Sequence, residues 1–559
     1  MNKYSTYHSR VLKHLVLWIG VATPLLIAGP LSLFAANFGD FDLGATQVAR
    51  LILPLLRLVL FAALITAALP FQAAVQICLI ALSIALYVQG NLVVWDYGRF
   101  DGTDIPWADY AYRGWIDAAI WLSILSVIII ARKRVMKDAS LIVGGLCAIQ
   151  LASSLLAFSQ SKAPYQVHIP QSGGHTLYSF SKEKGILMLI MDEFSSQAFS
   201  SILETRPETK KEFADFTYYR DTLAAFPTTY AAVPAILTGQ PAPIDGSLSA
   251  YFERSAPDSI NEQLATAGWN SEVVTFHPIC KHFKNGRCQS LNQSTALDKD
   301  TASKRELLKL LDLTLFRYAP HHLKIRIYND ERWFLQNEGT SSLIPNHRAS
   351  IRFVESFHGK IVGDSAQPTF KAIHLLVPHG PYHLTPECTR YVGPGRSAQR
   401  MFASNVECAF KLIDKIFTKM KDAGVYDSTT IVIVADHGTP IGFDKVSKGK
   451  PVHKGLRRAF PLLLIKPAGY RASESEEIKI DERQLSQLEI VGLLNDLNSL
   501  GLRVAPTQAR TESGDRLFHN YAWVNDNWSS DTLPKITTYG VRGESWNNDN
   551  WYPLNPEKK

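Results

Sequence analysis

The first 160 residues of the chain contain no glutamate and few charged side chains of any kind. They hold 11 lysines and arginines and eight aspartates, whereas the remaining 399 residues hold 47 basic and 43 acidic side chains. Soluble globular domains are about one-quarter charged, so a segment this sparse is typical of a membrane protein. The chain therefore divides into an amino-terminal membrane part and a water-soluble part.

The chain also lacks a strong excess of charge of one sign. Its formal net charge is +7, from 58 basic and 51 acidic residues, and no basic run is long enough to follow a phosphate backbone. Nucleic acid is therefore not expected as a partner. Because 46% of the residues are hydrophobic and 19% are charged, a disordered or collagen-like protein is also excluded.

Long hydrophobic runs are present in the first part. Each approaches the ~20 residues that a helix needs to cross the hydrocarbon core of a membrane. A cleaved signal peptide would account for the first run but not for five in succession. We therefore expect about five transmembrane helices, over residues 12–36, 48–69, 71–94, 115–131 and 139–158.

The charges between these runs predict the orientation of the membrane part. Lysines and arginines gather before the first run and between the fourth and fifth, whereas aspartates occupy the first and third loops. Positive residues stay on the cytoplasmic side, so the amino terminus is expected inside. An odd number of spans then delivers the soluble part to the outer side.

The soluble part has four cysteines, Cys280, Cys288, Cys388 and Cys408, while the other two lie in apolar runs. An even number in an exported domain predicts two disulfides. Four cysteines allow three pairings, of which Cys280–Cys288 with Cys388–Cys408 is the simplest. A zinc site is the competing interpretation, but no Cys-x-x-Cys spacing supports it.

Strands alternate with helices in the soluble part from residue 182 onward. The strand candidates are short and almost entirely apolar, as in a sheet that helices cover on both faces. Residues 401–421 show an apolar face at helical spacing, and Gly424 follows as a stop. This alternation predicts an α/β domain with a mainly parallel sheet. The strand candidates are 185–191, 272–276, 370–377, 430–435 and 461–465.

Candidate metal ligands and an imidazole follow three of these strands. Asp192 and Glu193 come directly after the first strand. Asp436 and His437 follow the fourth, and His379 follows the third in a Pro-His-Gly-Pro loop. Ligands of such sheets bind beyond the carboxyl ends of the strands, and carboxylates with an imidazole are a typical donor set for zinc or manganese.

A candidate nucleophile lies in the segment 227–239. Thr228 and Thr229 precede a helical stretch, and the amides at a helix start favour a bound phosphate. A metal ion that touches a hydroxyl lowers its pKa and makes it nucleophilic at neutral pH. Taken singly, these residues are equally well explained as helix caps or surface loop residues. Their joint occurrence at strand ends favours a catalytic site.

This set of residues resembles the alkaline phosphatase superfamily, specifically its sulfatase-like, membrane-anchored transferases of phosphoglycerol and phosphoethanolamine. The resemblance covers about residues 183–470. In that family the nucleophile lies ten residues before the glycine of a Leu-Thr-Gly tripeptide. Counting back from Gly239 indicates Thr229, with Thr228 as the alternative. The family's Asp-His-Gly signature falls at residues 436–438.

The resemblance implies a metal site and a cofactor. A divalent metal ion, zinc or manganese, would be held by Thr229, Asp436, His437 and an acid at the end of the first strand. Asp192 and Glu193 are both candidates for that acid, because transferases of this branch place a Glu there and phosphodiesterases an Asp. The two side chains would point to opposite faces of a continued strand. Asp192 is slightly preferred, since its place at the strand end resembles the phosphodiesterase pattern.

The resemblance also implies residues that handle the substrate. His379 and His453 are expected to bind phosphoryl oxygens or to protonate the leaving oxygen. Lys454 and His383 are expected to bind substrate. Arg57, near the outer end of the second span, either snorkels to the interface or holds the phosphate of a donor lipid.

The implied function is that of a membrane-anchored, metal-dependent transferase in a bacterial inner membrane. It would move a phospho-headgroup from a phospholipid to an extracytoplasmic glycan through a phospho-threonine intermediate. Sulfate hydrolysis is disfavoured, because sulfatases oxidise a Cys or Ser nucleophile to formylglycine and Thr cannot be oxidised in this way. The alternatives are a phosphodiesterase or phosphatase that uses water, and a non-catalytic envelope scaffold, which the retained site residues disfavour.

The expected organisation has four parts. The last part is rich in aromatic residues and asparagine, and its tryptophans would either stack on sugar rings or pack against the main domain. The parts are a transmembrane region (1–160), a linker (161–182), a sulfatase-like catalytic domain (183–500) and a carboxyl-terminal appendage (501–559).

Overall fold

The computed structural model describes most of the chain, in two compact units. One unit comprises residues 1–166 and 297–344, and the other residues 167–296 and 345–559. The sequence predicts residues 297–344 within the catalytic domain, whereas they belong to the first unit. The described residues are 3–36, 48, 52–97, 105–160, 176–275, 277–289, 291, 299–329, 333–336, 345–391, 396–443, 450–504, 509–522 and 531–554.

The first unit is built from apolar helices. Among the described residues, four are long and apolar enough to cross a membrane, which favours a membrane-anchored protein. The predicted span 48–69 corresponds to an apolar helix over Leu53–Ala68, which is short for a full crossing, so the predicted count of five is approximate. The four long helices are Tyr7–Ala36, Gln72–Asn91, Ala111–Ile130 and Arg132–Ser159.

Two of these apolar helices are made of more than one helical segment. The first long helix combines α1 (Lys3–Ala22), the π-helical turn η1 (Thr23–Ala28) and α2 (Gly29–Ala36). The short helix combines η3 (Leu53–Leu55) and α4 (Leu56–Ala68). The others are α5 (Gln72–Asn91), α6 (Ala111–Ile130) and α7 (Arg132–Gln160).

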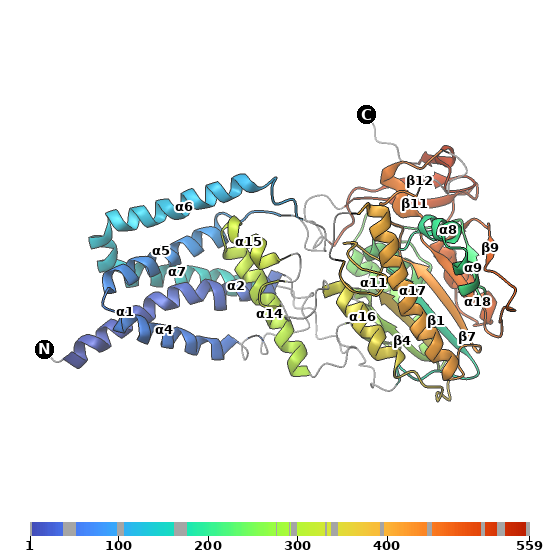
Figure 1. The fold of residues 1–559 in the computed structure, drawn as a ribbon, viewed down its shortest axis with the longest axis horizontal. Coiled ribbons are helices and arrows are strands. Elements are labelled where there is room, and N and C mark those ends of the chain that lie inside the picture. The colour runs from blue at the N-terminus through green and yellow to red at the C-terminus, as the bar shows by residue number, and fades with distance from the viewer. Residues whose placement is uncertain are drawn as a thin grey trace. The chain divides into compact units, whose positions relative to one another are not determined.

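Two helices from the middle of the chain complete the first unit (Figure 1). α14 (Lys299–Tyr318) packs against α2, α5 and η1, and α15 (His321–Tyr328) packs against α6. Asp117 of α6 is fully buried and accepts the backbone N–H of His321 at 2.7 Å and the Trp95 indole N–H at 2.8 Å. Because a buried carboxylate is costly without hydrogen bonds, these contacts fix α15 to α6.

The second unit is built around an eight-stranded sheet with the order β5-β4-β6-β1-β7-β8-β2-β9. The central pairs are parallel, whereas β8 is antiparallel to both of its neighbours. β1, β6 and β7 are buried along their whole length, as their apolar sequences require. The predicted α/β class with a mainly parallel sheet is confirmed.

The strands of the large sheet are β1 (Gly185–Met191), β2 (Thr217–Tyr219), β4 (Asn270–Val274), β5 (Arg287–Gln289), β6 (Thr369–Leu375), β7 (Thr429–Ala435), β8 (Leu463–Lys466) and β9 (Lys479–Asp481). A separate pair joins β3 (Thr222–Leu223) to β10 (Leu485–Ser486). The predicted bounds are correct for β1 and within about two residues for β4, β6, β7 and β8. All five therefore follow from the apolar runs alone.

Helix α17 (Ala398–Asp422) shows how the sequence sets the limits of an element. Ser397 caps its start, because its hydroxyl accepts the N–H of Arg400 at 3.4 Å. Gly424 follows its end with a φ of 68°, a conformation that favours glycine. α17 packs against α16 (Figure 1). The other helices are α8 (Ser196–Thr205), α9 (Glu208–Glu212), α10 (Thr229–Thr238), α11 (Leu248–Ser255), α12 (Ile260–Thr266), α16 (Pro345–His358) and α18 (Ile490–Asn498).

The carboxyl-terminal residues form a three-stranded antiparallel sheet of β11 (Arg516–Asn520), β12 (Thr537–Val541) and β13 (Trp551–Pro553). Trp546 is buried, and the ring of Trp551 meets Phe460 and Phe518 edge to face. These two tryptophans therefore pack within the domain. The other two, Trp523 and Trp528, lie outside the described residues.

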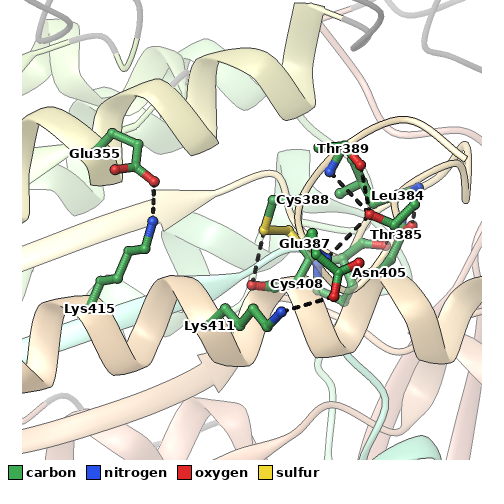
Figure 2. The surroundings of a disulfide bond; sticks show 11 residues. Glu355, Leu384, Thr385, Glu387, Cys388, Thr389, Asn405, Cys408, Lys411 and Lys415 are labelled. Carbon is green, nitrogen blue, oxygen red and sulfur yellow. Dashed lines mark hydrogen bonds and ion pairs between the residues drawn. A yellow bond between two sulfur atoms is a disulfide. The ribbon is translucent and has the colours of Figure 1, made fainter.

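Both predicted disulfides are present, in the simplest of the three pairings: Cys280–Cys288 and Cys388–Cys408. The second ties the loop after β6 to α17 (Figure 2). Beside it, Asn405 of α17 donates to the backbone carbonyl of His379 at 3.4 Å and accepts the N–H of Leu384 at 2.8 Å. The loop that carries His379 is thus fixed to a long helix.

Candidate active site

The candidate site lies at the carboxyl ends of β1 and β7. These strands are parallel neighbours in which Met191 pairs with Ala435, so the residues that follow them emerge at one edge of the sheet. Asp192, Asp436 and His437 each offer a ligand atom there, within 4.8 Å of the others. Their side chains are buried, so the protein encloses this three-residue cluster.

Thr229 is the first residue of α10 and points its hydroxyl at the cluster. Its Oγ1 donates to Asp436 Oδ2 at 2.6 Å. Thr228 is the extended N-cap residue, and its hydroxyl lies 2.5 Å from the Tyr521 hydroxyl. Of the two threonines that the sequence offers, Thr229 is therefore the one whose hydroxyl reaches the cluster.

Glu193 adjoins Asp192, but its side chain makes a different set of contacts. Its φ is 64°, which turns the chain sharply after β1. Its carboxylate accepts the Tyr382 hydroxyl at 2.6 Å and the Thr439 hydroxyl at 3.1 Å. Of the two candidate acids, Asp192 is the one that the structure brings together with Asp436 and His437.

The polar atoms of the cluster fit a divalent cation. Asp192 Oδ1 is buried without a hydrogen-bond partner among the described residues, which is costly unless a cation or a proton meets the oxygen. His437 Nδ1 lies 2.8 Å from the Gly438 carbonyl oxygen, and its Nε2 faces Asp192 and Asp436 at 3.7 and 3.5 Å. Two carboxylates, an imidazole and the Thr229 hydroxyl match the donors that zinc and manganese use in proteins.

The two carboxylates of the cluster perturb each other. Burial and the facing carboxylate of Asp436 raise the pKa of Asp192 well above its usual range. Burial would also raise the pKa of Asp436, but the imidazoles of His437 and His374 outweigh it and lower that pKa. Such a pair attracts positive charge to the space between its oxygens.

His379 lies beside the cluster, on the loop after β6. Its Nδ1 is 2.6 Å from the Gly380 carbonyl oxygen, and its Nε2 is 3.5 Å from Glu193 Oε2. Burial acts to lower the pKa of His379, but the carboxylates of Asp192 and Glu193 outweigh it and raise this pKa to about 9. The imidazole therefore carries a proton near neutral pH.

Among the described residues, His453, Lys454 and His383 are not members of the three-residue cluster. His453 and Lys454 are exposed at the start of η7 (Lys454–Ala459), where His453 Nδ1 accepts the Gly455 N–H at 3.2 Å. His383 is half-buried, and its backbone carbonyl accepts the Tyr391 N–H at 2.6 Å. Arg57 is exposed on α4 and belongs to the first unit.

The sequence analysis missed Arg458, which lies near the other end of η7. Its backbone carbonyl accepts the N–H of Gly438 at 2.8 Å, which fixes η7 to the turn after β7. Its Nη1 donates to the Pro227 carbonyl at 3.4 Å, directly before the two threonines. The available signal was the basic stretch around Lys454, within which sequence alone does not say which side chain turns inward.

His374 was also missed. It is a buried residue of β6 whose Nε2 lies 3.9 Å from Asp192 Oδ2 and whose Nδ1 lies 3.1 Å from Thr275 Oγ1. Burial lowers the pKa of His374 to about 4, so the ring is neutral at pH 7. The available signal was a histidine near the carboxyl end of a predicted strand, one residue before β6 ends at Leu375 and five before His379.

Comparison with solved structures gives only distant similarity. A protein of the alkaline phosphatase superfamily from Vibrio parahaemolyticus is 13% identical, with a TM-score of 0.40 over 68% of this chain and 84% of that one. The C-terminal periplasmic domain of EcEptC from Escherichia coli is 14% identical, with a TM-score of 0.35 over 62% and 91%. The lipoteichoic acid synthase LtaP from Listeria monocytogenes is 9% identical, with a TM-score of 0.37 over 68% and 88%.

Comparison with protein families is decisive. No curated protein matches the chain. The model of the sulfatase family matches residues 184–492, which is more than half of the chain and includes β1, α10, β7 and the three-residue cluster. The chain therefore belongs to the sulfatase family.

Proposed function

We propose that this protein is a membrane-anchored, metal-dependent transferase. It moves a phosphoglycerol or phosphoethanolamine headgroup from a phospholipid to an extracytoplasmic glycan. The observation that carries the proposal is the Thr229 hydroxyl, which stands at a helix start and 2.6 Å from Asp436, within a sulfatase-family domain on a chain with membrane helices. Threonine argues against formylglycine-dependent sulfate hydrolysis and favours a nucleophilic hydroxyl.

The residues that would hold the metal are Asp192, Asp436, His437 and Thr229. A divalent ion bound there, zinc or manganese, would lower the pKa of the Thr229 hydroxyl and neutralise charge on the phosphoryl group. The orphaned Asp192 Oδ1 and the hydroxyl aimed at Asp436 support this assignment. Phosphate in the site would also meet the backbone amides at the start of α10.

The transfer takes two balanced steps. Thr229 Oγ forms a bond to the lipid phosphorus, the bond from phosphorus to the diacylglycerol oxygen breaks, and the hydroxyl proton passes to solvent. The leaving oxygen takes a proton from the His379 imidazolium. A glycan hydroxyl then attacks the phospho-threonine and gives its proton to His379, and the released Thr229 oxygen regains a proton from solvent.

Arg458 would bind the anionic group during both steps. Apart from the bond to Pro227, its guanidinium N–H groups have no hydrogen-bond partner among the described residues. Arginine is well suited to phosphoryl oxygens, because its planar guanidinium can donate two parallel hydrogen bonds. Its place between the threonine segment and the turn after β7 supports this role.

An exported position for the catalytic domain is part of the proposal. Two disulfides join the four cysteines of this domain, and disulfides persist in oxidising compartments. The distribution of lysine and arginine between the apolar runs supports the same orientation. The lipid donor would then be taken from the outer leaflet of a bacterial inner membrane.

The proposal is tested with purified full-length protein, a fluorescent phospholipid and a glycan acceptor. Thr229→Ala is expected to release no diacylglycerol, Thr229→Ser to retain measurable release, and Thr228→Ala to be mild. Release that depends on added glycan supports transfer. Release at the same rate with water alone would establish a hydrolase instead, and full activity in Thr229→Ala would overturn the nucleophile.

A further inference from the structure

The membrane unit contains a cavity that the proposed chemistry does not use. Its volume is about 320 Å³, within the ~300–1,000 Å³ range of small-molecule sites. Every lining residue is apolar, and they come from α1, η1, α4, α14 and Leu335. An apolar cavity of this size offers water no hydrogen-bond partners, so a hydrocarbon group is the chemistry that it accommodates.

Part of the cavity wall comes from α14, which follows β5 in the chain. Leu311 and Leu315 of α14 lie four residues apart and therefore on one helix face, toward the membrane helices. The neighbouring residues Leu307 and Leu310 pack against Phe34 of α2, which holds α14 in place. Without α14 this surface would be an ordinary lipid-facing side of α1 and α4.

A cation adjoins one of the lining residues in the sequence. Arg57 immediately precedes the lining residue Leu58 in α4, is exposed, and makes no ion pair or hydrogen bond within the described part of the chain. The indole N–H of the lining residue Trp18 is already paired, since it donates to Thr66 Oγ1 at 3.1 Å. Among the described residues, an apolar cavity wall thus adjoins, in the sequence, an arginine whose charge is unpaired.

We infer that this cavity holds an acyl chain of a membrane phospholipid whose phosphate is met by Arg57. The apolar lining selects hydrocarbon, the cation selects an anionic headgroup, and the membrane supplies molecules that carry both. This inference rests on the proposed function to the extent that the bound lipid is the donor. On this inference α14 forms part of the cavity wall and helps to hold the donor lipid at the membrane unit.

The test uses full-length protein in nanodiscs with a phospholipid that carries a photoreactive group at the end of one acyl chain. Cross-links are expected in peptides of α1, α4 and α14. Ala62→Trp fills the cavity and should lower their yield about tenfold, because the indole occupies the space of the acyl chain. Ile65→Trp is the matched control, because it lies in the same helix, is 48% exposed and does not line the cavity.

Two further variants separate lipid binding in the cavity from the proposed transfer reaction. Leu315→Trp fills the cavity from α14 and replaces Ala62→Trp should that variant fail to fold. Arg57→Gln should raise KM for a long-chain donor more than for a short-chain soluble donor, whose binding gains nothing from the cavity. The inference would be overturned by cross-links that are spread evenly over the lipid-facing helices and are unchanged in both cavity variants. If such a protein still turns over phospholipid, the proposed function is unaffected. Localised cross-links without turnover of any phospholipid would instead overturn the proposed function alone.

Discussion

Replacement of Asp192 and Glu193, one at a time, separates the two candidate ligands. Asp192→Asn removes the carboxylate whose Oδ1 is buried without a hydrogen bond, so nothing replaces its charge at the cation. Glu193→Gln removes a carboxylate that lies outside the three-residue cluster, and the amide oxygen can still accept the hydroxyls of Tyr382 and Thr439. The two substitutions each remove one negative charge at adjacent positions and are matched in size.

The expected magnitudes differ. Mutating a residue that contacts a metal ligand but not the metal lowers metal affinity about 10–100-fold, or by about 1.4–2.7 kcal/mol. The loss of metal affinity in Glu193→Gln should fall in or below that range. Asp192→Asn should exceed it, with an affinity loss of more than about 100-fold. Glu193→Gln should also shift the alkaline limb of the pH–rate profile downward, because Glu193 is one of the carboxylates that raise the pKa of His379.

The assay is calorimetric titration of the metal-stripped protein with zinc and with manganese, alongside the bound metal content after dialysis. The melting temperature of each stripped variant serves as the folding control. Equal losses in both variants, or a larger loss in Glu193→Gln, would refute the assignment of Asp192 as the ligand.

Three further predictions concern residues outside the metal cluster. Arg458→Gln should raise KM for the anionic donor or lower kcat by at least about tenfold, whereas Arg458→Lys should show only part of that loss. Steady-state kinetics on variants with intact metal content measures both effects. His519 is buried and its pKa is lowered to about 4, so the imidazole stays neutral in the folded protein while the unfolded chain takes up a proton below pH ~6.5. The folded protein therefore loses stability as the pH falls toward 4. His519→Gln should show a smaller drop in melting temperature between pH 7 and pH 5. Arg516 and Asp221 are both buried and form a bidentate ion pair at 3.0 and 3.1 Å. Arg516→Met leaves that carboxylate unpaired and should lower the free energy of unfolding by about 3–5 kcal/mol. Adding Asp221→Asn to the same chain should restore part of that stability.

The elements that the sequence predicts well are those whose signal is local. β1 was predicted over its observed residues because an unbroken apolar run between polar neighbours has few other outcomes. Asp192, Asp436 and Thr229 meet because strand ends in a parallel sheet share one edge and α10 starts there. The disulfide pairs join cysteines that are near in sequence.

The features that the sequence did not predict depend on where side chains and segments turn. The left-handed backbone of Glu193 directs its carboxylate to Tyr382, and nothing in the order Asp-Glu encodes that turn. Within the basic stretch of η7, Arg458 contacts the threonine segment whereas Lys454 is exposed. α14 has the composition of a soluble helix, yet its leucines pack in the membrane unit.

The covalent role of Thr229 is the central claim, and intact-mass spectrometry of the protein mixed with a phospholipid donor tests it most directly. The glycan acceptor is left out, so that the intermediate accumulates. We expect an adduct with the mass of phosphoglycerol or phosphoethanolamine on the peptide that contains Thr229, present in wild type and absent in Thr229→Ala. Diacylglycerol release by wild type with no adduct on any peptide would contradict the account and indicate direct attack by water or by the acceptor.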